Sequence, residues 1–323
     1  MLERQHGGSR RNRLEPTPTG KRVSPQERDL LWFVKLADHG PMPTSFLLEF
    51  SRHIHKSEKR AKERLADLFN EDNTPHQGPY LTRPPQQFQT IDSRYQQLVH
   101  DIGQTALSAL KEQGLSAHPK QSGPWLHSFM VSCITASVEL ACRQRDDLNY
   151  IPQGAIIARA NTILRWPTEI SDPNSGSTYT KDLLPDAVFG LEHQTDSGSR
   201  FRFFAVEADR ATEPASSSNF HRKSFERHLL QYTEYIEHGG YSEHLNLTAP
   251  MLVLNVTSDS RRMEKMISLT QERFPAGNSY QLFAKWDAFA TPFKPPKPNF
   301  SLLRSPWARA GLAPFELQSY RGQ

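Results

Sequence analysis

Apolar residues recur at helical spacing near the beginning of the chain. Leu30, Phe33, Val34 and Ala37 lie on one side of a helix, because they are separated by one, three or four positions. Gly40, followed directly by a proline, supplies a stop signal. The pattern therefore predicts an amphipathic helix that buries one face in a small domain.

Two further helices and a short strand follow. The second helix is expected over about residues 43–51, and the third begins near Lys56 in a polar stretch. A turn-rich segment then leads into a short strand over 80–83. Three helices with a small β-wing match a winged helix-turn-helix, predicted for residues 25–84. Residues 1–24 are polar and basic, and they are expected to form a disordered arm.

The rest of the chain alternates helices and strands. Residues 85–124 have the pattern of a polar connector with one helix over about 91–113. The expected elements after it are a helix from Trp125, a strand at about 154–166, two strands within 181–214, a helix at about 219–238, a strand at 251–257, a helix at about 260–274 and a strand at 280–290. A sheet flanked by helices buries such a series, so the fold class is α/β (α+β overall), with a second domain over 125–290. The proline-rich tail, 291–323, is expected to be extended.

Acidic residues interrupt the apolar pattern in the two strands within 181–214. Glu207 and Asp209 fall on one face of the second strand, since alternate residues share a face. A DSGS turn at 196–199 reverses the chain, which would bring Asp186 from the first strand beside them. Three neighbouring carboxylates repel one another unless a cation lies between them. Their oxygen ligands suit Mg²⁺ or Mn²⁺, so Asp186, Glu207 and Asp209 are the candidate metal ligands.

Composition narrows the class of protein. Of 323 residues, 36% are hydrophobic, and no stretch approaches the roughly 18 consecutive apolar residues of a membrane span, so no membrane partner is expected. The net charge of +4 and pI near 9.0 permit nucleic-acid binding without requiring it. Cys133 and Cys142 are poorly placed for a disulfide, and a reducing cytoplasm is the expected location. The chain lacks a P-loop, a dinucleotide-binding glycine motif and a nucleophile elbow.

Basic residues gather on the third predicted helix. Lys56, Lys59, Arg60 and Arg64 would lie near DNA phosphates if this helix enters the major groove. Arg60 is the candidate for a base edge, because its guanidinium can address guanine. A solvated surface of a protein-docking helix is the alternative interpretation.

The hairpin resembles the PD-(D/E)XK, or restriction-endonuclease-like, superfamily. Pro185-Asp186 is followed after twenty residues by Glu207-Ala208-Asp209. The resemblance covers about 125–290 and implies that Asp186 and Glu207 hold a divalent metal. The position of the family's lysine is here Asp209, which cannot supply the positive charge that the lysine gives.

The next helix offers a substitute for that lysine. Lys223, Arg227, Gln231 and Tyr235 are spaced by four positions and so share a helix face. Gln231 and Tyr235 form the Gln-x-x-x-Tyr signature seen in some members, and Lys223 is the candidate for a migrated catalytic lysine. Glu139, in the helix from Trp125, is the candidate for an additional acid. A solvated helix face is the alternative for each of them.

A narrower resemblance, to the replication-relaxation family of plasmid and phage proteins, covers residues from about 25 to 290. It is carried by the winged-helix beginning, by PWLHSF and by LLPDAVFGL followed by FFAVEADRATEP. The family's PDA and E-x-D-R-x-T-E elements correspond to Asp186 and to Glu207, Asp209, Arg210 and Glu213. Arg210 and Glu213 are therefore candidate accessory residues.

The resemblance implies a DNA-binding protein of plasmid or phage replication. Its partners would be DNA and replication or mobilisation proteins, and the sequence leaves its oligomeric state open. One alternative is a metal-dependent nickase or endonuclease that acts through Asp186, Glu207, Asp209 and Lys223. The other is a non-catalytic regulator or replication initiator with a degenerate nuclease-like domain. A toxin or defence nuclease would share the domain and differ in genomic neighbourhood.

Overall fold

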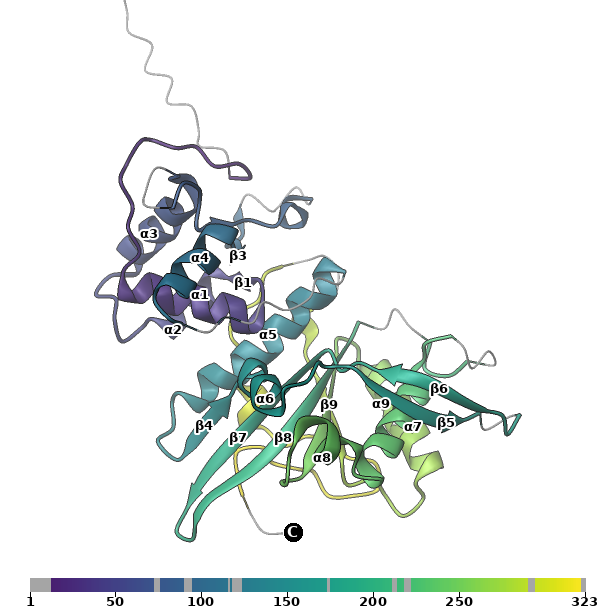
Figure 1. Ribbon diagram of the computed structural model, residues 1–323. Coiled ribbons are helices and arrows are strands. Elements are labelled where there is room, and N and C mark those ends of the chain that lie inside the picture. The colour runs from purple at the N-terminus through teal and green to yellow at the C-terminus, as the bar shows by residue number, and fades with distance from the viewer. Residues whose placement is uncertain are drawn as a thin grey trace, which may run out of the picture. The chain divides into compact units, whose positions relative to one another are not determined.

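The structure of the protein is a computed structural model. It describes residues 13–72, 76–89, 95–115, 117, 124–172, 175–210, 214–217, 222–289 and 294–320. The chain divides into two compact units, residues 1–117 and residues 118–323 (Figure 1). Each unit is described by itself.

The first unit combines a small antiparallel sheet with four helices. Its elements are α1 (Glu27–His39), β1 (Met42–Pro43), α2 (Thr44–Phe50), α3 (Glu58–Asn70), β2 (Leu81–Thr82), the 3-10 helix η1 (Pro85–Phe88), β3 (Val99–Ile102) and α4 (Gln104–Glu112). The strands pair antiparallel in the order β1-β3-β2. The order of the elements is helix, strand, helix, helix, strand, strand, so α3 comes directly before β2 and β3.

The core of this unit grows from the apolar face of α1. Trp32 and Phe33 are fully buried, and the Phe33 ring stacks on Tyr80 at a centroid distance of 5.6 Å. The indole N–H of Trp32 donates to the Leu47 carbonyl at 2.7 Å, which ties α1 to α2. Gly40 ends α1 with a φ of 99°, a conformation that favours glycine. The expected first helix and its stop are therefore present.

The connector expected over 85–124 differs from the structure. Where a single helix was predicted at about 91–113, residues 99–102 form β3 and residues 104–112 form α4. β3 pairs with both other strands, and α4 contacts α1. These residues complete the first unit, because short strands that gain their hydrogen bonds from distant partners leave little local periodicity.

The second unit is built on a mixed five-stranded sheet. Its elements are α5 (Trp125–Cys142), β4 (Leu148–Ile151), α6 (Gln153–Ala160), β5 (Trp166–Ser171), β6 (Thr178–Leu183), β7 (Ala187–Thr195), β8 (Gly198–Asp209), α7 (Phe225–Glu237), α8 (Gly240–Leu245), β9 (Met251–Thr257), α9 (Ser260–Arg273), β10 (Gln281–Lys285), the 3-10 helix η3 (Asp287–Phe289) and α10 (Ser301–Arg304). The sheet order is β10-β9-β8-β7-β4, in which β8, β9 and β10 are parallel and β7 and β4 run antiparallel to their neighbours. β5 and β6 form a separate antiparallel ribbon (Figure 1).

The register of the strands decides which side chains point toward the helices that cover the sheet. Glu207, Asn255 and Phe283 lie in register across β8, β9 and β10, so they point to the same face. Phe283 packs in one cluster with Phe225 of α7 and Met266 of α9. The face that carries Glu207 is therefore the face covered by α7 and α9. α5 packs along β4, β7 and β8.

Two expectations for the second unit were wrong. Residues 153–160 form helix α6 rather than part of a strand over 154–166, and Asn161 ends this helix at a φ of 51°. The tail is packed rather than simply extended, since Trp307 and Leu317 are buried and Ala308 forms a β-bridge with Phe283. Apolar side chains scattered among prolines were enough to anchor it.

α5 is, in the described part of the chain, the one helix long and apolar enough to cross a membrane. Most of it is buried inside the second unit, as in the core helix of a soluble protein. Cys133 and Cys142 both lie in this helix, and both are free and buried. The expectation that they form no disulfide is confirmed.

Candidate functional site

The β7–β8 hairpin brings Asp186 and Glu207 together. Residues 187–195 pair with residues 206–198 without a bulge, and extending this register by one residue sets Asp186 opposite Glu207. The backbone N–H of Ala208 donates to Asp186 Oδ2 at 2.9 Å. The predicted hairpin thus forms, and one oxygen of Asp186 is fixed to the backbone of the opposite strand.

Glu207 is held from the side of α7. Its side chain is 12% exposed; the Tyr232 hydroxyl donates to its Oε1, and His228 Nδ1 lies 3.5 Å from its Oε2. Burial, followed by the charge of Asp186, raises the pKa of Glu207, while His228 and the Tyr232 hydroxyl act in the opposite direction. Burial and the nearby Glu207 likewise raise the pKa of Tyr232.

A second histidine reaches Asp186 from α5. His127 Nε2 lies 2.8 Å from Asp186 Oδ1, and both side chains are partly exposed. We use the name acid–histidine cluster for His127, Asp186, Glu207, His228 and Tyr232. In it each carboxylate has one imidazole beside it, a setting suited to holding and exchanging protons near solvent.

Asp209, the third predicted ligand, is engaged elsewhere. Both Arg262 Nε and Nη2 donate to its Oδ2, at 2.9 and 2.6 Å, from the first turn of α9. Arg262 is itself fixed there, because its backbone N–H donates to Asp259, the N-cap of that helix. The position where the family has its lysine, Asp209, is therefore paired with the positive charge of Arg262.

The three predicted metal ligands consequently do not fit a divalent ion as arranged. Asp186 accepts from His127 and Ala208, Glu207 contacts α7, and Asp209 binds Arg262. Among the residues that the structure describes, no group of three or more histidines, cysteines, aspartates or glutamates is arranged to hold a metal.

The predicted helix face on α7 is directed at the ribbon. Gln231 is buried, and its amide donates to Thr168 Oγ1 at 3.2 Å and to the Asp182 carbonyl at 3.0 Å. The Tyr235 hydroxyl contacts His244 Nδ1 at 2.8 Å. Gln231 and Tyr235 thus hold β5, β6 and α8 in place. Lys223 is exposed in the segment before α7.

Among the remaining accessory candidates, Glu139 lies apart from the acid–histidine cluster. Glu139 is buried in α5, and Arg143 forms an ion pair with it at 3.3 Å. It lies twelve residues beyond His127, or about 18 Å along the helix axis. Arg210 directly follows β8, and its buried Nε has no hydrogen-bond partner among the described residues. Glu213 lies outside the described residues.

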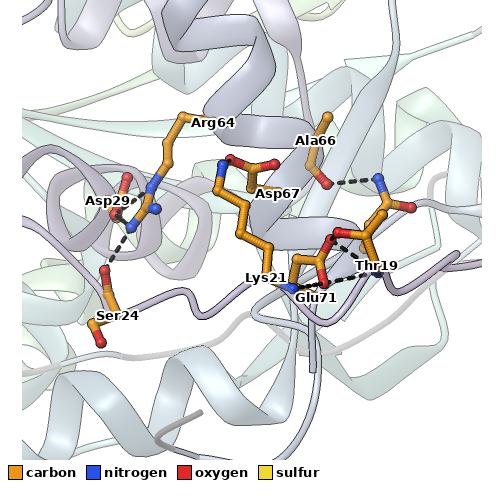
Figure 2. Close-up of polar contacts among 9 residues, drawn as sticks. Thr19, Lys21, Ser24, Asp29, Arg64, Ala66, Asp67 and Glu71 are labelled. Carbon is orange, nitrogen blue, oxygen red and sulfur yellow. Dashed lines mark hydrogen bonds and ion pairs between the residues drawn. The ribbon is translucent and has the colours of Figure 1, made fainter. Parts of the chain in front are cut away.

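The basic residues of α3 fall into two groups. Lys56, Lys59 and Arg60 are exposed around the first turn of the helix. Arg64 is largely buried, and its guanidinium donates to Asp29 Oδ2 and to the Ser24 carbonyl (Figure 2). Arg64 therefore joins α3 to α1, and the exposed cations are concentrated at the beginning of α3.

Sequence reasoning missed four residues of the second unit: His127, His228, Tyr232 and Arg262. His228 and Tyr232 are four positions apart on α7. They form a second stripe, displaced by one residue from the stripe of Gln231 and Tyr235, and its spacing is visible in the sequence. His127 lies in the PWLHSF segment, but no local pattern pairs it with Asp186, fifty-nine residues away. Only the folded topology shows these contacts.

Comparison with known proteins gives the family. No curated protein and no solved structure matches the chain. The family model described as replication-relaxation matches residues 33–249, which is more than half of the chain and includes α3, the β7–β8 hairpin and α7. The chain therefore belongs to the replication-relaxation family.

Proposed function

We propose that this protein binds duplex DNA through its first unit and acts in replication in the cytoplasm. The observation that carries the proposal is the position of Lys56, Lys59 and Arg60, exposed at the start of α3. The element order of the unit supports a winged helix-turn-helix, in which the helix corresponding to α3 would enter the major groove through its N-terminal residues. Membership of the replication-relaxation family supports the role in replication.

The chemistry of these side chains assigns different tasks to them. Lysine ammonium groups bind phosphates and release counterions, which supplies affinity that weakens with salt. The guanidinium of Arg60 can donate two hydrogen bonds to guanine, which supplies preference for a base. β2 and β3 would form the wing that lies along the DNA backbone.

The test is DNA binding by variants of α3. Arg60→Ala should weaken binding to a preferred duplex by about 1–3 kcal/mol and reduce sequence preference. Lys59→Ala should weaken binding to all duplexes alike and reduce the magnitude of the salt slope by about 0.9. Lys111→Ala, which removes an exposed cation from α4, is the matched control and should leave both unchanged. Wild-type protein that binds no duplex in fluorescence anisotropy at low salt would refute the proposal.

For the second unit we favour a non-catalytic scaffold for DNA or partner proteins. The Asp209–Arg262 pair favours it, because it uses the third carboxylate and leaves the lysine position without a catalytic cation. One observation favours cleavage instead: Asp186 and Glu207 are adjacent, and the pKa of Glu207 is raised by burial and by that neighbour.

Plasmid nicking in Mg²⁺ or Mn²⁺ separates these two alternatives. A nuclease should lose activity in Asp186→Asn and Glu207→Gln, by a factor of about 100 or more. Asp196→Asn, at the exposed tip of the same hairpin, is the control that should retain activity. Absence of metal-dependent nicking by the wild type, with unchanged DNA binding in both site variants, supports the scaffold.

A further inference from the structure

Residues 13–24, expected to belong to a disordered arm, are bound to the surface of α3 instead. We use the name strap for these twelve residues. Val23 is buried, and Arg83 Nη1 donates to the carbonyl of Arg13 at 2.9 Å. The strap therefore has an anchor in the apolar core and another beside the segment that follows β2.

Glu71, which follows the last residue of α3, is the centre of the attachment. Its carboxylate accepts hydrogen bonds from the backbone N–H and hydroxyl of Thr19 and from the backbone N–H of Lys21 (Figure 2). Gly20 lies between them at a φ of 81°, which turns neighbouring N–H groups toward one anion. Burial tends to raise the pKa of Glu71, but these hydrogen bonds outweigh it and lower that pKa.

Three further contacts extend the attachment along the helix. The backbone N–H of Thr17 donates to Asn70 Oδ1 at 3.0 Å, and the Lys21 ammonium pairs with Asp67. Arg64 donates to the Ser24 carbonyl. The strap thus follows α3 from its end toward its middle, as Figure 2 shows.

One stripe of α3 carries both a proposed DNA-contacting residue, Arg60, and the groups that attach the strap. Arg60, Arg64, Asp67 and Glu71 are separated by four, three and four positions, so they form one stripe along the helix. The stripe begins with an exposed cation and ends with two carboxylates. Asp67 and Glu71 would repel phosphates if they were uncovered, since like charges at close range are unfavourable.

The strap compensates the negative charge of this end of the stripe. Lys21 neutralises Asp67, and Glu71 is enclosed by backbone N–H groups. Arg22 is exposed, and no hydrogen bond or ion pair is found for its side chain among the described residues. The strap therefore carries an exposed cation, Arg22, next in sequence to the lysine that pairs with Asp67.

We propose that the strap is a built part of the DNA-contacting surface, held by Glu71, in which Arg22 binds a phosphate next to α3. The proposal rests on the proposed function and identifies a second set of contacts for it. Because Glu71 fixes the strap before DNA arrives, the cost of ordering this segment is met in folding rather than in binding.

The test asks whether removing the negative charge of Glu71 strengthens or weakens DNA binding. Glu71→Gln removes a negative charge near DNA, which by charge alone should strengthen binding. If the strap carries a phosphate contact, the same change should weaken binding about threefold to tenfold, because the strap is released. Glu63→Gln removes an equal charge from the exposed surface of α3 and is the matched control, expected to leave binding unchanged or stronger.

Two measurements on the full-length protein complete the experiment. Hydrogen exchange should show faster exchange at the Thr19 and Lys21 amides in Glu71→Gln but not in Glu63→Gln. Arg22→Ala should keep this protection and reduce the magnitude of the salt slope of duplex binding by about 0.9.

The outcomes distinguish the two proposals. If wild-type protein binds duplex DNA while Glu71→Gln behaves like Glu63→Gln and Arg22→Ala leaves the salt slope unchanged, the strap proposal is wrong and the proposed function stands. If wild-type protein binds no DNA, both proposals are wrong.

Discussion

Glu207 shows at the scale of one residue how a site can oppose stability. Its carboxyl is buried beside Asp186, and both conditions raise its pKa. A raised folded-state pKa means that the native protein binds a proton more tightly than the unfolded chain does. The contribution to stability is complete below the ordinary pKa of glutamate and is lost as pH rises through the raised pKa.

Glu207→Gln should therefore stabilise the protein at neutral pH. The amide oxygen can still accept from the Tyr232 hydroxyl, while the buried charge and its repulsion by Asp186 are removed. We expect the free energy of unfolding at pH 7 to rise by about 1 kcal/mol, as is common when a functional site is neutralised. The gain should disappear below pH 4, where glutamate is protonated in either state.

Urea unfolding of wild type and variant between pH 3 and pH 8 measures this difference. Glu192→Gln, which changes a more exposed carboxyl on β7, serves as the control because hydrogen bonds from Ser199 and Asn149 lower rather than raise its pKa. A Glu207→Gln protein that is less stable than wild type at pH 7 would show that the carboxylate is a structural acceptor.

At the scale of secondary structure elements, α7 carries two stripes of side chains. One contacts Glu207 of the sheet, and the other contacts the β5–β6 ribbon and α8. His228 and Tyr232 contact Glu207, whereas Gln231 and Tyr235 contact the β5–β6 ribbon and α8. The Gln-x-x-x-Tyr pattern was found in the sequence because spacing of four is visible there. Its neighbour with His228 and Tyr232 has the same spacing, and only the sheet register decides which stripe lies over Glu207.

Gln231→Leu tests the structural assignment of that pattern. The change leaves the Asp182 carbonyl without its side-chain donor and should destabilise the protein by about 1–3 kcal/mol. Protection of the ribbon, residues 166–183, against limited proteolysis should fall, while DNA binding by the first unit should remain unchanged. Glu234→Gln, which alters a partly exposed side chain of α7 paired with His238 of the same helix end, is the control. Normal ribbon protection in Gln231→Leu would contradict the assignment.

Elements with strong local signals could be predicted, and those held by distant partners could not. The sequence indicated α1, α5, β9 and α9, because their apolar periodicity or continuous apolar runs are local properties. It indicated the β7–β8 hairpin from alternation and a turn. β3 and the strap escaped prediction because their hydrogen bonds come from residues about fifty positions away.

For the whole molecule, the central point is the division into two units with separate cores. The first unit has its own buried core, in which α1, with the fully buried Trp32 and Phe33, packs against α2, β3 and α4. Its sheet is formed by β1, β3 and β2, which all belong to the first unit. A compact unit with its own core and its own sheet is expected to fold independently.

A fragment of residues 1–117 should therefore fold and keep the DNA-binding properties of the full protein. It contains α3, the strap and both partners of every contact that joins them. We expect a cooperative thermal transition in circular dichroism, and a salt slope of duplex binding equal to that of the full chain within about one phosphate contact. A fragment that ends at residue 84, the boundary predicted from sequence, is the control. It lacks β3, the central strand of the sheet, and should remain unfolded.

If both fragments fold equally well, β3 and α4 are dispensable, and the unit boundary found in the structure has no energetic meaning. If the longer fragment folds but its salt slope falls by several contacts, the second unit supplies most of the phosphate contacts, and DNA binding must be assigned to both units.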